Sequence, residues 1–178
     1  MTAFVALLRA VNLGSHGKVA MPALRDMLVG LGFDDARTLL NSGNAVFNGK
    51  GTAAALETKL EEKAAQQLGL NTEFFVRTAA HWDAIVAANP FAKEARDAPG
   101  ILVLACLKDT PTAAAVKALQ AASKGPEQIR AVGKQLYVTY PNGQGRSKLT
   151  TALVAKHVGT NTARNWNTVL KLAAAVAE

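Results

Sequence analysis

The same order of strand and helix patterns occurs twice along this chain of 178 residues, and the repeat limits the fold more than any other feature. Short apolar runs bounded by turn residues predict strands, whereas apolar residues at spacings of three and four predict helices. The first half contains, in order, a strand, a helix, a hairpin, a helix and a strand, at 3–11, 21–33, 36–48, 52–69 and 71–78. A connecting helix at 79–89 and a Pro- and charge-rich linker at 90–100 follow.

The second half starts the order again. Its strand, helix, hairpin and helix patterns lie at 101–109, 110–123, 127–141 and 147–159, before the segment TARNW and a final helix. Thr110 is the expected N-cap of the first of these helices, with Pro111 at its first position. The hairpin is predicted to turn at Gly133–Lys134.

Each half therefore has the order β-α-β-β-α, which is that of the split βαβ, ferredoxin-like motif. We predict an α+β fold of two tandem ferredoxin-like units packed together, with a connecting helix and a C-terminal helix. The predicted divisions are a first unit at 1–78, a connecting helix and linker at 79–100, and a second unit at 101–178 that includes the C-terminal helix.

The net charge of +7 is confined to the last third of the chain. Residues 128–177 contain no Asp or Glu, and their seven bases are Arg130, Lys134, Arg146, Lys148, Lys156, Arg164 and Lys171. The other 13 bases balance the 13 acids of the chain. A surface of one sign attracts anionic ligands. The alternative, a basic face that only keeps the protein in solution, stays open.

Several classes of function lack their signatures. Cys106, the single cysteine, lies in an apolar run and is expected to be a buried, inert thiol. His16, His81 and His157 are scattered, so no metal site is predicted, and no cofactor is expected. We find no phosphate-loop or nucleophile-elbow motif, assign no catalytic residue and leave open whether the protein is an enzyme. No apolar run approaches the ~20 residues of a membrane span, and the N-terminus does not read as a signal peptide, so a cytoplasmic location is expected.

Five ordered segments carry a resemblance to a known family. The segments FVALLRAVNLG, MPALRDMLVGLGF, RTLLNSGNAVF, GRSKL and TARNWNTVLKL are similar to those of bacterial domain-of-unknown-function family 1697. The resemblance covers nearly the whole chain. It implies a duplicated ferredoxin-like fold and no particular activity.

The loop 142–150, NGQGRSKLT, is the first candidate binding site. Ser147 is placed to cap the helix that follows, and Arg146 and Lys148 flank it. A helix N-terminus with exposed amides, a partial positive dipole and two cations can bind an anion. The alternative is an ordinary capped helix with two solvated bases.

The segment 159–171 is the second candidate, and Arg164 is its central residue. Thr162 or Asn165 can cap the last helix, and Trp166 belongs to its buried stripe. Because Arg164 precedes this buried aromatic, neighbouring amides are expected to hold its guanidinium, which can then bind a phosphate or carboxylate. The alternative is a structural arginine bound to carbonyl groups. For a single site, the cations Arg146, Lys148 and Arg164 must converge on one pocket or face.

The third candidate lies at the end of the first strand. Arg9 stands in an apolar run and must be paired or reach a cleft. Asn12 follows it, and Ser42 and Asn44 belong to the turn NSGN, which they either build or supply with small polar contacts. Lys18 and Asn165 complete the predicted set of binding residues.

These features predict that the protein binds an anionic, phosphate-bearing ligand, such as a nucleotide or another phosphorylated small molecule, at a basic helix N-terminus. Two alternatives stay open. One is binding of RNA or single-stranded nucleic acid through a basic face, and the other is a protein interaction module.

Overall fold

The structure is a computed structural model that describes residues 1–12 and 17–178. His16 and most of the first glycine-containing loop lie outside the described residues. The elements of the first half are β1 (Thr2–Leu8), α1 (Met21–Gly30), β2 (Asp34–Leu39), β3 (Asn44–Gly49), α2 (Ala53–Leu68), β4 (Phe74–Thr78), α3 (Ala79–Ala87) and α4 (Ala92–Asp97). The elements of the second half are β5 (Leu102–Leu107), α5 (Ala113–Ala122), β6 (Gln128–Val132), β7 (Gln135–Thr139), α6 (Thr151–Val158), β8 (Asn161–Asn165) and α7 (Trp166–Ala177), with 3₁₀ turns at Pro99–Ile101 and Gln144–Arg146.

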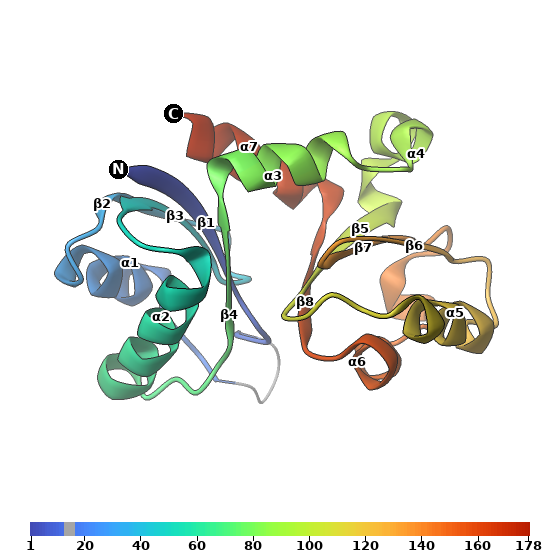
Figure 1. Cartoon of the computed structure of the whole chain (residues 1–178), viewed down its shortest axis with the longest axis horizontal. Coiled ribbons are helices and arrows are strands. Elements are labelled where there is room, and N and C mark those ends of the chain that lie inside the picture. Colours follow the sequence, from blue (N-terminus) through green and yellow to red (C-terminus); the bar gives the residue numbers. More distant parts are fainter. Residues whose placement is uncertain (13–16) are drawn as a thin grey trace. The chain divides into compact units, whose positions relative to one another are not determined.

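The strands form two four-stranded antiparallel sheets within a mixed α+β fold (Figure 1). The strand order is β2-β3-β1-β4 in the first sheet and β6-β7-β5-β8 in the second. Every recorded strand pair is antiparallel. The first to fourth strands of each half therefore occupy the same places in the two sheets, so the repeated pattern of the sequence is also a repeated topology.

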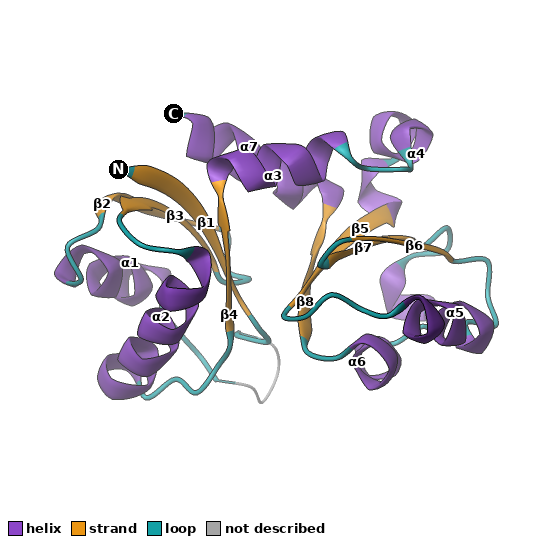
Figure 2. Ribbon diagram, in the orientation of Figure 1, coloured by secondary structure: helices purple, strands orange, loops and turns teal. Residues whose placement is uncertain are grey.

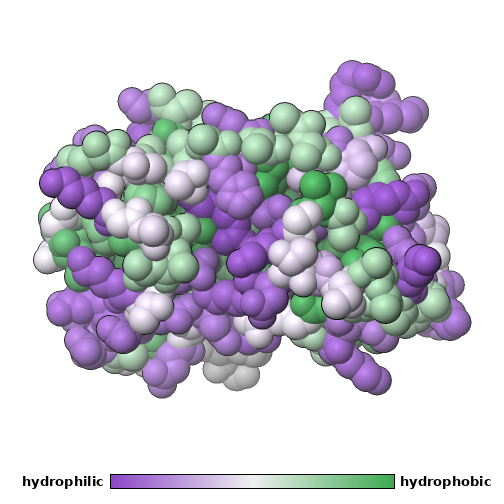
Figure 3. Space-filling view, in the orientation of Figure 1, coloured by the Kyte–Doolittle hydropathy of each residue, from purple (hydrophilic) through white to green (hydrophobic). Residues whose placement is uncertain are grey.

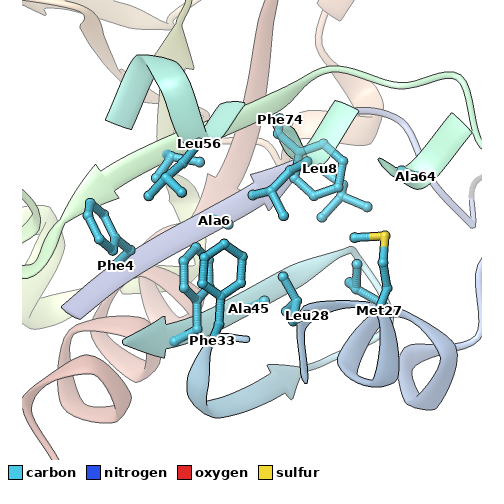
Figure 4. Packing of buried hydrophobic residues seen from close by; sticks show 14 of the residues in the cluster. Phe4, Ala6, Leu8, Met27, Leu28, Phe33, Ala45, Leu56, Ala64 and Phe74 are labelled. Carbon is cyan, nitrogen blue, oxygen red and sulfur yellow. The ribbon is translucent and has the colours of Figure 1, made fainter. Parts of the chain in front are cut away.

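One face of the first sheet is covered by α1 and α2 (Figure 2). Alternate residues of β1 point to this face because side chains alternate across a strand. Phe4, Ala6 and Leu8 therefore pack against Leu28 of α1 and Leu56 of α2 in one apolar cluster (Figure 4). Val5 and Leu7, which point to the opposite face of the sheet, are buried as well, so the strand is apolar on both faces.

Local signals place the ends of α2. The hydroxyl of Thr52 accepts a hydrogen bond from the amide of Ala55 at 3.2 Å, which caps the first turn. Gly69 follows the last turn with φ +59°, in the left-handed conformation that ends many helices.

The second sheet is covered on one face by α5 and α6, which contact each other (Figure 2). Val103, Ala105 and Leu107 of β5 pack there against Leu119 of α5 and Val154 of α6. The hairpin between β6 and β7 pairs Val132 with Gln135, so it turns at Gly133–Lys134 as predicted.

Two helix starts differ from the predictions. The hydroxyl of Thr112, not that of Thr110, caps α5 by accepting a hydrogen bond from Ala115 N at 3.1 Å. Thr150, not Ser147, caps α6, with Leu153 N as the donor at 3.2 Å. In both cases several Ser or Thr residues precede the helix, and their similar intrinsic preference for the cap does not select among them.

The described chain divides into two compact units. The first consists of 1–84 together with 171–178, and the second of 85–170. The end of α7 therefore groups with the first unit, although the sequence prediction gave all of it to the second. Arg37 of β2 provides one contact that joins this segment to the first unit: its guanidinium donates to the carbonyl of Ala175 at 2.6 Å and pairs with the carboxylate of Glu178.

Candidate functional site

The two units differ in charge. Residues 85–170 contain eleven Lys and Arg but four Asp and Glu, a net charge of +7, whereas the rest of the chain contains nine of each. Within the second unit, the recorded ion pairs join Lys93 and Arg96 to Asp97 at α4. Most cations of this unit therefore have no carboxylate partner in the described part of the chain.

Ser147 is held by an acidic side chain instead of capping α6. Its hydroxyl donates to Glu127 Oε1 at 2.5 Å and accepts from Leu149 N at 3.0 Å. The second carboxylate oxygen of Glu127 accepts from the hydroxyl of Ser123 at 3.4 Å. Glu127 thus joins the end of α5 to the loop that leads into α6.

This bridge brings three cations to one corner of the second unit. Lys124 follows Ser123, and Arg146 and Lys148 flank Ser147; we call these three residues the basic corner. All three are exposed. Lys124 Nζ donates to the carbonyl of Ala121 at 3.2 Å, and over residues 1–12 and 17–178 none of the three forms an ion pair. The carboxylate of Glu127 is committed to the two serines.

The basic corner lies beside the N-terminus of α6. The first amides of a helix have no partner within it, and the helix dipole adds partial positive charge there. The amide of Leu153 in this first turn is already bonded to the hydroxyl of Thr150, so the helix dipole is what α6 adds to the charge of the corner. Lys117 of α5 and Lys156 of α6 are also exposed. Each lies two residues, or about 200° around the helix, from a buried residue of the same helix, Leu119 or Val154, so both side chains project away from the sheet. Neither helix contains an acid.

The pKa of Tyr140 provides a test of how deeply its hydroxyl is buried beside Glu127. Burial, and next the negative charge of Glu127, raise the pKa of Tyr140 to about 12 from its ordinary 10.0. A raised pKa favours folding below pH 10.0, and this stability is lost as the pH rises through about 12.

We expect the wild type to lose about 2–3 kcal/mol more unfolding free energy than Tyr140→Phe over this interval. Urea denaturation at intervals of pH measures the difference. Arg164, whose pKa burial shifts downward to about 10, is present in both proteins and cancels. If the unfolding free energies of the wild type and of Tyr140→Phe depend on pH in the same way, the hydroxyl of Tyr140 is not buried as the structure shows.

Arg164 does not belong to the basic corner. Ala163 packs on the helix-covered side of the second sheet, so Thr162 and Arg164, its neighbours in β8, point to the opposite face. Arg164 is buried, and its Nη1 donates to Thr162 Oγ1 and to the carbonyl of Ala163, both at 2.8 Å. The predicted convergence of Arg164 with Arg146 and Lys148 is therefore wrong.

A second arginine occupies the corresponding place in the first unit. Arg77 of β4 is also buried, and its Nη1 donates to the carbonyl of the preceding Val76 at 2.9 Å and pairs with Glu57 at 3.4 Å. Each arginine is paired in register with an apolar residue of the neighbouring central strand: Arg77 with Val5 of β1, and Arg164 with Leu104 of β5. Sequence reasoning missed Arg77, although alignment of the two repeats would have paired it with Arg164.

The residue after each arginine is the last of its strand and caps the helix that follows. The hydroxyl of Thr78 accepts from His81 N at 3.1 Å, and Asn165 Oδ1 accepts from Thr168 N at 3.0 Å. Asn165 is thus a helix cap. The polar residues around Arg164 largely build the junction between β8 and α7.

The residues of the third predicted site, at the end of the first strand, make separate contacts with neighbouring loops. Arg9 pairs with Glu73 at 3.3 Å, with both side chains partly exposed. The side-chain amide of Asn12 donates to the carbonyls of Val19 and Asn41 at 3.0 and 2.8 Å. Lys18 is exposed.

The turn between β2 and β3 uses its own polar side chains. Asn44 is fully buried, and its amide donates to Leu39 O and Ser42 Oγ, both at 2.8 Å. These contacts give Ser42, Asn44 and Asn12 a role in holding the loops in place.

Residues of the first unit line three hollows, and basic side chains take part in two of them. One, of about 320 Å³, has Asp35, Arg37, Asn48 and Glu178 among its lining residues, but Asn48 already donates to Asp35 at 3.0 Å and Arg37 pairs with Glu178. The other, of about 490 Å³, is lined in part by Phe33, Lys50 and Lys59. Neither includes a residue of the basic corner.

The described ranges also lack two other kinds of feature. Residues 1–12 and 17–178 contain no group of three or more His, Cys, Asp or Glu side chains that could hold a metal ion. None of the described helices combines the length and apolar character that a membrane span requires.

Comparison with known proteins gives a family and a fold. A family described as "Protein of unknown function (DUF1697)" matches residues 1–137. The structure is similar to that of conserved bacterial protein SP0830 from Streptococcus pneumoniae, with a TM-score of 0.73, 22% sequence identity and 98% of each chain covered. No curated protein matches the chain. At this identity the structural likeness concerns the fold alone.

Proposed function

This chain belongs to the DUF1697 family, whose description names no activity, and we propose from the structure that its second unit binds a phosphate-bearing ligand at the basic corner. The observation that carries the proposal is the grouping of Lys124, Arg146 and Lys148 around the Glu127 bridge, with no ion pair among the residues described. Ser147, which sequence reasoning included, is not a contact in this proposal because Glu127 and Leu149 engage its hydroxyl.

The topology supports a finer description of the scaffold. In both units the strand order places the first strand between the third and the fourth, with the two crossover helices on one face. This is the arrangement of a ferredoxin-like unit. We therefore propose two ferredoxin-like units, the second of which carries the ligand.

Several exposed cations are needed because each contributes little alone. An exposed ion pair contributes about 0–1 kcal/mol, because water and salt screen the charges. We propose that the three cations act together, beside the positive end of the α6 dipole. The net charge of +7 on this unit also speeds the arrival of anions.

A second candidate is binding of nucleic acid. The observation that favours it is the extension of the basic corner by Lys117 and Lys156 over α5 and α6. Hydrophilic side chains are visible along the edge formed by these helices in Figure 3. The loop residues from Pro141 to Arg146 are all exposed, which suits an extended polyanion at least as well as a small molecule.

Ligand binding is tested by thermal shift with inorganic pyrophosphate, nucleotides, sugar phosphates and oligonucleotides, each beside its unphosphorylated counterpart where one exists. Phosphorylated compounds are expected to raise the melting temperature because they bind the native state. The double variant Arg146→Ala/Lys148→Ala should weaken binding about tenfold or more, the equivalent of ~1.4 kcal/mol.

The matched control is Arg25→Ala/Lys171→Ala, which removes one exposed arginine and one exposed lysine from the first unit. It should bind like the wild type. The proposal is wrong if no phosphorylated compound binds, or if the two double variants weaken binding equally.

A further inference from the structure

Neither sheet offers an open face to nucleic-acid bases. In ferredoxin-like modules that bind single-stranded RNA, bases stack on aromatic residues of the exposed face of the central strands. Here the central strands of the second sheet, β5 and β7, are buried at every position. In the first sheet, β1 is buried from Phe4 to Leu8, and β3 from Asn44 to Phe47.

The aromatic side chains are buried too. The chain has six Phe, two Tyr and two Trp, all of them within the described residues, and none is more than 7% exposed. They are Phe4, Phe33, Phe47, Phe74, Phe75, Phe91, Tyr137, Tyr140, Trp82 and Trp166. Stacking of one base on an aromatic ring contributes about 1–3 kcal/mol, and single-strand binders depend on it. No aromatic ring of this protein is exposed for that purpose.

The helix side of the second unit offers a different surface. Five exposed cations belong to α5, α6 and the basic corner, namely Lys117, Lys124, Arg146, Lys148 and Lys156. Lys117 lies within α5, whereas Lys124 follows Ser123, the residue that caps the end of this helix. Such a surface of long cationic side chains suits contact with phosphates, which position nucleic acid without reading its sequence.

We infer that the phosphate-bearing ligand is a nucleic-acid duplex, held by its backbone across α5 and α6 without stacked bases. This inference rests on the proposed function. A duplex presents its phosphates at higher density and in a rigid array, with one charge per about 1.7 Å of axis. A single strand must be ordered on binding, and here no aromatic stacking offsets that entropy.

Fluorescence anisotropy tests the inference with labelled duplexes of about 20 base pairs, in two unrelated sequences, and with their separate strands. The duplexes should bind the full chain at least tenfold more tightly than the strands, and the two sequences should differ by less than about threefold. If all five cations neutralise phosphates, affinity should fall about 500-fold between about 50 and 200 mM salt. For Arg146→Ala/Lys148→Ala the fall should be about 40-fold, because about two fewer counterions are released. Arg25→Ala/Lys171→Ala should keep the salt dependence of the wild type.

Other outcomes separate the inference from the proposed function. Equal or tighter binding of single strands, or a strong sequence preference, would overturn the inference and leave phosphate binding in place. The same holds if a nucleotide or sugar phosphate binds at the basic corner and duplexes do not. Absence of binding to every phosphorylated compound would overturn both.

Discussion

Gly43→Ala is expected to lower the free energy of unfolding by about 2–5 kcal/mol. Gly43 closes the turn between β2 and β3 with φ +79°, a conformation that penalises any residue with a Cβ atom. An added Cβ would also lie 2.6 Å from Cγ2 of Val11 and 2.9 Å from Cβ of Leu8. The amide of Leu8 donates to the carbonyl of Gly43 at 2.9 Å, so the turn cannot move away without loss of this bond.

Gly32→Ala is the matched control for this prediction. Gly32 has nearly the same φ, +80°, but a Cβ added there would meet no atom within 4 Å. Its substitution should cost about 1–2 kcal/mol, from backbone strain alone. Urea denaturation followed by circular dichroism measures both variants. If Gly43→Ala destabilises no more than Gly32→Ala, the close approach of the turn to Val11 and Leu8 does not exist.

The second large effect is expected at Arg164. Arg164→Ala should lower the free energy of unfolding by about 2–5 kcal/mol, because it leaves the buried Thr162 hydroxyl and Ala163 carbonyl without this donor and opens a cavity. The pKa of about 10 keeps the guanidinium protonated at neutral pH despite its burial. Its removal therefore deletes a charged, hydrogen-bonded group.

Arg146→Ala is the comparison that separates stability from binding. Arg146 is exposed, and its substitution should change the free energy of unfolding by less than about 0.5 kcal/mol while it weakens ligand binding. Arg164→Ala should lower the free energy of unfolding but leave ligand binding unchanged, when binding is measured at a temperature where the variant is folded. A stable Arg164→Ala protein that no longer binds phosphate would place Arg164 in the ligand site and refute the structural role.

The repeat and the hairpins were predictable because they depend on short-range signals. The alternation of apolar residues, the glycine in the turn at Gly133–Lys134 and the apolar runs of β1 and β5 act within a few residues. The candidate site was predictable only in part. The basic residues of the loop 142–150 were found from their positions next to a helix start, but Lys124 was not, since it is more than 20 residues away in sequence.

The sequence alone determined the repeated order of strands and helices, the family and the location of the excess positive charge, because local patterns and composition settle these. It did not predict α4 (Ala92–Asp97), which forms within the segment 90–100 that was expected to be a linker. Only the tertiary structure decided which cations share a surface. Glu127, reaching Ser123 and Ser147, joins Lys124 to Arg146 and Lys148, whereas the alternation of side chains along β8 turns Arg164 to the opposite face of the sheet. The physical reason is that contacts between residues distant in sequence depend on packing and long-range hydrogen bonds, which leave no local pattern.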